Sequence, residues 1–232
     1  MTNHQRKFSI PLIAWALAAF AGGCGGAPGS GVRRHVEPFH AIEIDGAMNV
    51  AVESAADSAI RLAAGEAEVS VRSGVLFVTP AGGTVPDVEV RTAGLGRISV
   101  AGDGDVRIDL DPDSRERLVL SVSGSGRVVI RGVRAELVRL EVGGAPEVEV
   151  AGSAGRLEVA SEGAGALDLG GLCVETADVE LDGAGRVTVT AEARVDARIA
   201  GGGLLRYHAP HDLPAPEGGE VERLADAGAC GR

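Results

Sequence analysis

Aromatic residues and lysine are scarce in this sequence of 232 residues. Phe, Trp and Tyr together make up 3% of it, and Lys7 is the only lysine. Basic residues number 22 against 33 acidic ones, which gives a formal net charge of −11. Such an acidic chain is a poor partner for a nucleic-acid backbone, which is itself a polyanion. The 35 glycines follow no triplet period, which excludes collagen, and 45% hydrophobic residues are too many for a disordered polar chain.

The sequence also lacks an apolar run long enough to cross a membrane as a helix. Its most apolar stretch, residues 8–21, has 14 residues, whereas a bilayer core of about 30 Å needs about 20. The stretch follows Arg6 and Lys7 and leads through small residues to Cys24, the layout of an export signal. It resembles a bacterial lipoprotein signal, which implies cleavage before Cys24 and acylation of that residue. An ordinary secretory signal with a coincidental cysteine is the alternative.

Lipidation would tie the mature chain to a membrane, because two or three acyl chains on one residue give stable anchoring. Gly25 follows the cysteine, and by resemblance to lipoprotein sorting this favours the outer membrane over the inner one. The glycine-rich residues after it predict a flexible tether. Removal of residues 1–23 leaves 20 basic against 33 acidic residues, a formal charge of −13.

Short runs of alternating apolar and polar residues, punctuated by glycine, fill the rest of the chain. Residues 148–150, 157–159 and 187–189 are examples. This period of two is typical of strands with one buried face, and no long window shows a helical period. The sequence therefore predicts an all-β protein.

The alternation belongs to an internal repeat that begins with a glycine turn. The repeat starts at spacings of 22, 20, 19, 20 and 18 residues, at Gly102, Gly124, Gly144, Gly163, Gly183 and Gly201. Apolar residues follow at the fourth and sixth positions, and a second apolar run ends two residues before the next glycine. Stacked windings would bury equivalent positions on one another, which predicts a parallel β-solenoid with coils of about 18–22 residues. An antiparallel sandwich is the alternative.

The order of these motifs resembles a known family. They are the opening Phe39-x-x-Ile42-x-Ile44-x-Gly46, the Gly-Ser-Gly type of turn and the closing residues 201–207. Together they are similar to the putative auto-transporter adhesin, head GIN domain family. The resemblance implies a right-handed parallel β-helix in an exported or lipid-anchored protein, without established catalytic residues. The division that follows is a signal peptide at 1–23, lipidated Cys24 with a tether at 24–36, a solenoid domain at 37–224 and a tail at 225–232.

Several motifs contain residue types that are capable of chemistry. The Gly-x-Gly turns open strands rather than helices, so they are interpreted as corners and not as phosphate loops. Gly124-Ser125-Gly126 is one more corner and not a nucleophile elbow. Phe77 and Tyr207 alternate with apolar residues and are expected to face the core. We predict no catalytic residues and no cofactor.

Two groups of potential metal ligands occur. His208, His211 and Asp212 lie close in sequence, but Pro210 separates the histidines, which favours a solvated loop over a zinc site. The carboxylates of the second group share an acidic stretch that predicts a solvated outer face rather than a calcium site, namely Asp103, Asp105, Asp109, Asp111 and Asp113. No metal site is therefore predicted. Cys173 and Cys230 are able to form a disulfide in an exported protein, but their separation in space is left open.

Arginine and carboxylate residues alternate at positions expected to point outward: Arg127, Arg131 and Arg139 against Glu136, Glu141, Glu147 and Glu149. The resulting hypothesis is a non-catalytic envelope lipoprotein that presents a rigid solenoid for adhesion or for binding an envelope polymer or protein. The membrane, through Cys24, is its other partner. A scaffold subunit that assembles through the solenoid ends is the alternative, and a polysaccharide-active enzyme has the least support.

Overall fold

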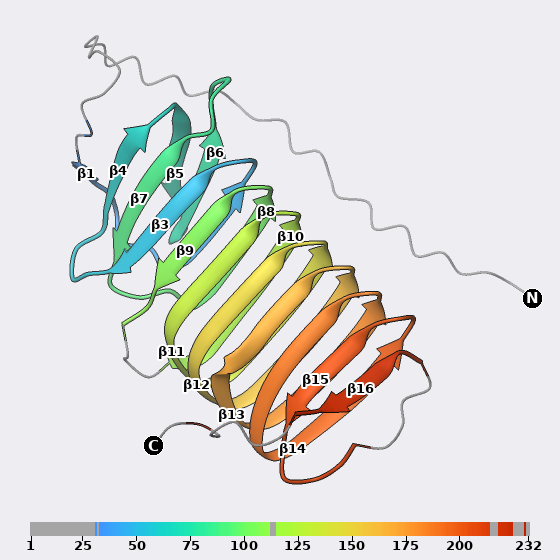
Figure 1. The fold of residues 1–232 in the computed structure, drawn as a ribbon. Coiled ribbons are helices and arrows are strands. Elements are labelled where there is room, and N and C mark those ends of the chain that lie inside the picture. The colour runs from blue at the N-terminus through green and yellow to red at the C-terminus, as the bar shows by residue number, and fades with distance from the viewer. Residues whose placement is uncertain (1–30, 32, 112–114, 214–217, 225–229, 231–232) are drawn as a thin grey trace, which may run out of the picture.

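A computed structural model describes residues 31, 33–111, 115–213, 218–224 and 230 (Figure 1). Within these ranges the chain is all β, as the sequence predicts. The described residues contain no helix that is long and apolar enough to cross a membrane. The signal, Cys24 and Asp113 lie outside the described residues.

The chain forms one 16-stranded sheet that winds around its own core. Its strands, in chain order, are β1 (Arg33–His35), β2 (Ala41–Asp45), β3 (Asn49–Ser54), β4 (Ala59–Ala64), β5 (Ala67–Arg72), β6 (Val75–Pro80), β7 (Asp87–Thr92), β8 (Arg97–Gly102), β9 (Asp105–Asp109), β10 (Arg115–Gly124), β11 (Arg127–Gly144), β12 (Glu147–Gly163), β13 (Ala166–Gly183), β14 (Arg186–Ala200), β15 (Leu204–His208) and β16 (Glu220–Arg223).

From β8 onward, each winding pairs in parallel with the winding before it. The corner glycines lie in register from Gly102 to Gly124, Gly144, Gly163 and Gly183. The predicted β-solenoid with coils of about 18–22 residues is confirmed, and the antiparallel sandwich is wrong. The sequence suggested two short strands in each coil, but β11 to β14 each run as one bent strand around a corner (Figure 1).

The bent strands give the solenoid two walls. The first wall contains β4, β7, β3 and β9, then the first halves of β11 to β14, and β15 and β16. The second wall contains β5, β6, β2, β8 and β10, then the second halves of β11 to β14. Register shifts mark the bends, for example between Ile130 and Val133 in β11. Gly132 lies there with a φ of 73°, a conformation that favours glycine.

The N-terminal end departs from the parallel pattern. β1 and β7 both pair antiparallel with β4, and β5 pairs antiparallel with β6. Ile60 of β4 is buried, and Leu62 and Val71 pack against the core. These strands cap the N-terminal end of the solenoid, where the described part of the chain has no further parallel winding to bury the apolar residues.

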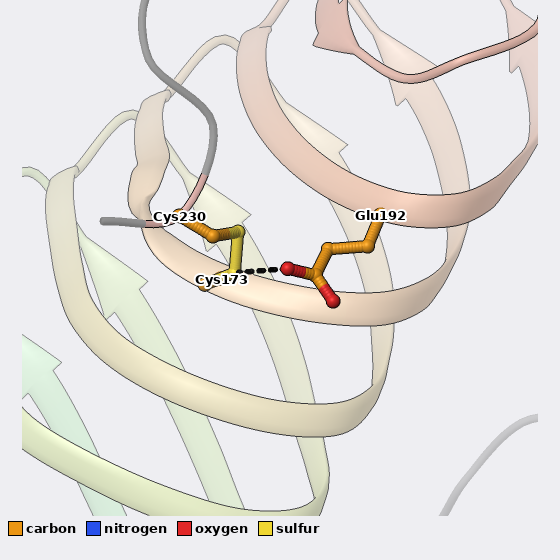
Figure 2. A group of neighbouring side chains, drawn as sticks. All are labelled: Cys173, Glu192 and Cys230. Carbon is orange, nitrogen blue, oxygen red and sulfur yellow. Dashed lines mark hydrogen bonds between the residues drawn. A yellow bond between two sulfur atoms is a disulfide. The ribbon is translucent and has the colours of Figure 1, made fainter. Parts of the chain in front are cut away.

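The C-terminal end is closed by a short segment and a disulfide. The Leu213 N–H donates to the Tyr207 hydroxyl at 3.0 Å, which holds the segment after β15 against the last winding. Cys230 is disulfide-bonded to Cys173 of β13, with their Cα atoms 5.3 Å apart (Figure 2). The disulfide that the sequence left open therefore joins the tail to an interior winding.

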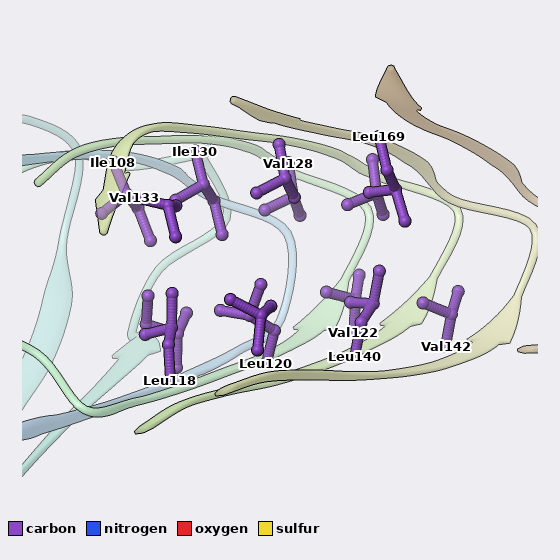
Figure 3. Close-up of a cluster of buried hydrophobic side chains, with 14 of the residues drawn as sticks. Ile108, Leu118, Leu120, Val122, Val128, Ile130, Val133, Leu140, Val142 and Leu169 are labelled. Atoms are coloured by element: carbon purple, nitrogen blue, oxygen red, sulfur yellow. The ribbon is translucent and has the colours of Figure 1, made fainter. Parts of the chain in front are cut away.

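Aliphatic side chains fill the space between the walls (Figure 3). The first wall contributes one column of buried residues in register, namely Val50, Val106, Val128, Val148, Leu167, Val187 and Leu205. The second wall contributes a facing column of Ile98, Leu120, Leu140, Val159 and Val179. Burying each such side chain stabilises the fold by about 1.5–3 kcal/mol.

The two aromatic residues assigned to the core behave differently. Tyr207 is buried, as expected. The expectation for Phe77 is wrong, because its neighbours Leu76 and Val78 point inward and Phe77 lies on the outer face, opposite Glu43 and Ser70. The alternation of period two holds in this strand, but Phe77 occupies an outward position in it.

Candidate functional site

A groove of about 910 Å³ lies on the outer surface of the second wall. The second halves of β11 to β14 form its floor, and residues 211–213 form one side. Parallel pairing places equivalent positions of four consecutive windings side by side, so outward side chains form rows across the floor.

One row carries a ladder of ion pairs. It runs in register from Arg139 through Glu158 and Asp178 to Asp196. Arg139 Nη2 lies 2.6 Å from Glu158 Oε2. Arg156, from the adjoining row, bridges Glu158 at 3.3 Å and Asp178 at 2.7 Å. The hydrogen bond and charge of Glu158 raise the pKa of Arg139.

The next row of outward side chains contains fewer ion pairs. It contains Glu141, Ala160, Glu180 and Arg198 in register. Within the described part of the chain, none of its charged members forms an ion pair, and all four residues are exposed. The small side chain of Ala160 leaves the floor low between two carboxylates. The groove therefore offers neutralised arginine–carboxylate rungs beside a row of free charges.

The side of the groove includes two of the three residues that the sequence grouped as possible zinc ligands, His211 and Asp212. Asp212 Oδ1 lies 2.7 Å from Arg223 Nη1, and Arg223 Nη2 donates to the Pro210 carbonyl at 3.3 Å. Within the described ranges, the structure does not bring His208, His211 and Asp212 together as a set of metal ligands. The segment is a loop anchored by an arginine.

The acidic stretch near residue 105 is likewise an outer face. Asp103 lies at a corner and accepts hydrogen bonds from the Ser125 backbone N–H at 3.0 Å and its hydroxyl at 2.6 Å. These bonds lower the pKa of Asp103 because they favour its charged form. Asp105 pairs instead with Arg107 at 2.9 Å. Among the described residues, these carboxylates do not converge on one point.

The three outward arginines named from the sequence pair with carboxylates of the next winding. Arg127 lies 3.5 Å from Glu147, and Arg131 lies 3.7 Å from Glu149 on the first wall. Arg139 pairs with Glu158 on the second wall. Exposed pairs of this kind contribute at most about 1 kcal/mol each, so they are available to exchange partners with a ligand.

Sequence reasoning missed two features. The return of residues 211–213 to the groove depends on the bond to Tyr207, which has no sequence signature. Glu192 was also missed. Its carboxylate oxygen lies 3.9 Å from Cys173 Sγ (Figure 2), and the signal that points to it is a register irregularity in β14, visible only once the windings are stacked.

A parallel β-solenoid with a polar groove along one wall defines an elongated scaffold with a repetitive outer surface. Comparison with protein families matches residues 38–209 to the putative auto-transporter adhesin, head GIN domain family. The chain belongs to this family, as its motifs suggested.

Solved structures share the fold. A putative adhesin from Bacteroides fragilis is 17% identical, with a TM-score of 0.71 over 83% of this chain and 95% of that one. A putative adhesin from Parabacteroides distasonis is 19% identical, with a TM-score of 0.63 over 84% and 96%. A putative lipid binding protein from the same species is 15% identical, with a TM-score of 0.57 over 83% and 93%. No curated protein matches the chain.

Proposed function

We propose that this protein is a lipid-anchored component of the bacterial cell envelope whose solenoid binds an extended macromolecular partner without catalysing a reaction. The groove on the second wall carries the proposal. It repeats the same outward positions over four windings, so it suits a polymer or polypeptide that contacts several rungs at once. The adhesin titles of the structural neighbours agree with a binding role.

The chemistry of the floor supports recognition of polar partners. Arg156 and Arg194 have side chains 55% and 70% exposed, so each is able to pair with an incoming group while it remains near its own carboxylate. The planar guanidinium binds carboxylate, sulfate or phosphate groups through paired hydrogen bonds. The groove also holds the carboxylates Glu141 and Glu180, which form no ion pair among the described residues. The partner class that we infer is therefore an envelope polymer or protein that bears isolated anionic groups among neutral or basic ones, and not a polyanion.

A non-catalytic role agrees with the ion pairing of three carboxylates in the groove. Glu158, Asp178 and Asp196 are neutralised by arginines, and the chain after the signal contains no lysine to act as a proton-abstracting base. A scaffold subunit is the competing interpretation. It predicts self-association through the solenoid ends, which sedimentation of the purified protein over a range of concentrations would reveal.

The groove is tested with the mature protein and isolated, washed cell envelopes. Arg156→Gln with Arg194→Gln removes two groove cations, and Arg127→Gln with Arg186→Gln removes two from the first wall. We expect retention on envelopes to weaken at least about tenfold, or about 1.4 kcal/mol, for the groove variant alone. Equal retention of both variants and the wild type would exclude the groove as the binding surface.

The anchor requires a separate test. Cells that express wild type or Cys24→Ala are labelled with a palmitate analogue and then exposed to protease while intact. We expect label in the wild type only, and loss of membrane association in Cys24→Ala. Label in both would contradict lipidation at Cys24, and protease protection in the wild type would assign the anchored protein to the periplasmic face.

A further inference from the structure

We propose that Cys173, Cys230 and Glu192 form a binding site for one thiophilic divalent cation, such as Zn²⁺, when the disulfide is reduced. This site is distinct from the groove and does not depend on the proposed envelope function. The tail would then be attached to β13 in either of two states, through the disulfide when oxidised or through the metal ion when reduced.

The geometry supplies three ligand atoms. Both sulfurs and a carboxylate oxygen of Glu192 lie within 4.8 Å of one another. Zinc bonds to sulfur and oxygen of about 2.0–2.3 Å place neighbouring ligands of a tetrahedral ion about 3.3–3.8 Å apart. Metal binding after reduction requires the sulfurs to separate to that spacing. The carboxylate oxygen, which lies within 4.8 Å of both sulfurs, has to approach them by at most about 1.3 Å. Solvent provides the fourth ligand.

The backbone of β14 is irregular where it presents Glu192. Val174 pairs with Ala191 and Thr176 pairs with Arg194, so Glu192 and Ala193 together face the single residue Glu175. Such a bulge re-aims a side chain out of the regular alternation. Here it directs Glu192 toward Cys173 on the neighbouring winding (Figure 2).

The disulfide does not account for this approach of the carboxylate. A disulfide sulfur carries no hydrogen, so it has nothing to donate to Glu192. Within the described residues, Glu192 forms no ion pair and no contact with another donor. A carboxylate directed at two sulfurs without a cation is the arrangement that a bound metal ion would complete, because thiolate and carboxylate are both zinc ligands.

A dithiol is the reductant that we propose for the disulfide. Thiol–disulfide exchange transfers two electrons and two protons from the dithiol to the Cys173–Cys230 bond, which gives two thiols and the oxidised donor. Binding of Zn²⁺ then releases two protons as both thiols become thiolate ligands. The oxidised protein has no thiolate to offer, so binding is restricted to the reduced state.

The test uses Co²⁺ as a spectroscopic probe and Zn²⁺ for affinity, with the mature chain in a Cys24→Ala background so that only two thiols remain. We expect the reduced protein to bind one Co²⁺ per chain with a sulfur-to-cobalt charge-transfer band. The oxidised protein and Cys173→Ser should lack this band. Its absence from the reduced protein would overturn the proposal.

The role of Glu192 is tested by a matched pair that keeps both cysteines and therefore still forms the disulfide. Glu192→Gln should weaken Zn²⁺ binding at least about tenfold, the scale on which even outer-shell partners of a metal act. Glu175→Gln removes an exposed carboxylate from the facing strand and should leave the affinity unchanged. Equal affinities for the two variants would overturn the three-ligand site.

Discussion

The parallel windings and the N-terminal cap of the solenoid contribute to the same two walls, but their strands pair differently. From β8 to β15 each winding lies parallel to the one before, with corner glycines in register. At the N-terminal end, β4 and β5 instead pair antiparallel with β7 and β6. Parallel windings need a repeat because each position must fit the same position one coil earlier. The antiparallel strands, as a cap, are under no such constraint.

Glycine also has different roles in the corners of the parallel windings and in the hairpin of the cap. Gly163 has a φ of 140°, and a Cβ built there would overlap the Gly144 carbonyl oxygen of the previous corner. At the cap, β5 and β6 are joined by Ser73 and Gly74, both at positive φ, as in a two-residue type I′ hairpin. Corner glycines thus serve stacking between windings. The hairpin glycine supplies the local reversal, and its carbonyl accepts a hydrogen bond from the His40 backbone N–H at 3.0 Å.

The largest expected effect comes from removing a core side chain from a parallel winding. Leu140 is fully buried in the second-wall column, so Leu140→Ala should lower the free energy of unfolding by about 2–5 kcal/mol. Val69 of the hairpin cap is 36% exposed, and Val69→Ala should cost less than about 1 kcal/mol. Urea denaturation followed by far-ultraviolet circular dichroism measures both. A cost for Val69→Ala equal to that for Leu140→Ala would show that the cap is as tightly packed as the coils.

A corner variant tests the need for glycine in the parallel windings, with a control in the preceding corner. Gly163→Ala should destabilise by about 3 kcal/mol, because it combines a strained φ with overlap of the neighbouring corner. Gly143, beside corner residue Gly144, has open space where a Cβ would lie. Gly143→Ala should therefore remain within about 0.5 kcal/mol of wild type. If both substitutions are tolerated in thermal unfolding, the corners do not require glycine.

The regular part of the fold could be predicted from the sequence because repetition reveals register. Spacings of 18–22 residues between glycines fix which side chains lie above one another, as Val128 lies beside Val148. The cap could not be predicted in this way. Ser73-Gly74 is a recognisable hairpin signal, but the alternation on either side of it reads the same in a parallel or an antiparallel sheet.

The groove was predictable only in part. The outward arginines and glutamates followed from alternation, and pairs such as Arg127 with Glu147 follow once the coil length is known. The closure of one side by residues 211–213 depends on a hydrogen bond between side chain and backbone. The pairing of Cys173 with Cys230, 57 residues apart, depends on where the tail returns. Neither feature leaves a periodic trace.

The disulfide is expected to stabilise the C-terminal end selectively. It closes a loop with a sequence separation of 57, and Cys230→Ser should cost about 2–4 kcal/mol through the unfolded chain's entropy. In hydrogen exchange, we expect faster exchange in β13 to β16 and unchanged protection in β4 and β7. Reductant should lower the melting temperature of the wild type but not of Cys230→Ser. A uniform loss of protection would indicate that the two ends unfold as one unit.

The smallest expected effect concerns the hydrogen bond between the corner residues Asp103 and Ser125. Asp103 and Ser125 occupy successive corners and are joined by side chain, whereas later corners carry Ala164 and Ala184 at this place. The bonds from Ser125 lower the pKa of Asp103 below its ordinary value of 3.8. The contribution to stability is therefore present above the unfolded-state pKa and is lost as the pH falls through the folded-state pKa.

Ser125→Ala should raise the pKa of Asp103 toward its ordinary value, because the hydroxyl hydrogen bond, the largest cause of the lowered pKa, is removed. Carbon-13 NMR titration of the Asp103 carboxyl measures the shift directly. Ser123→Ala is the matched control, since Ser123 is an exposed serine two residues earlier that belongs to β10 rather than to the corner. The same titration curve in Ser125→Ala and Ser123→Ala would mean that neighbouring corners are held together by their backbones alone, as they are where alanine takes the place of serine.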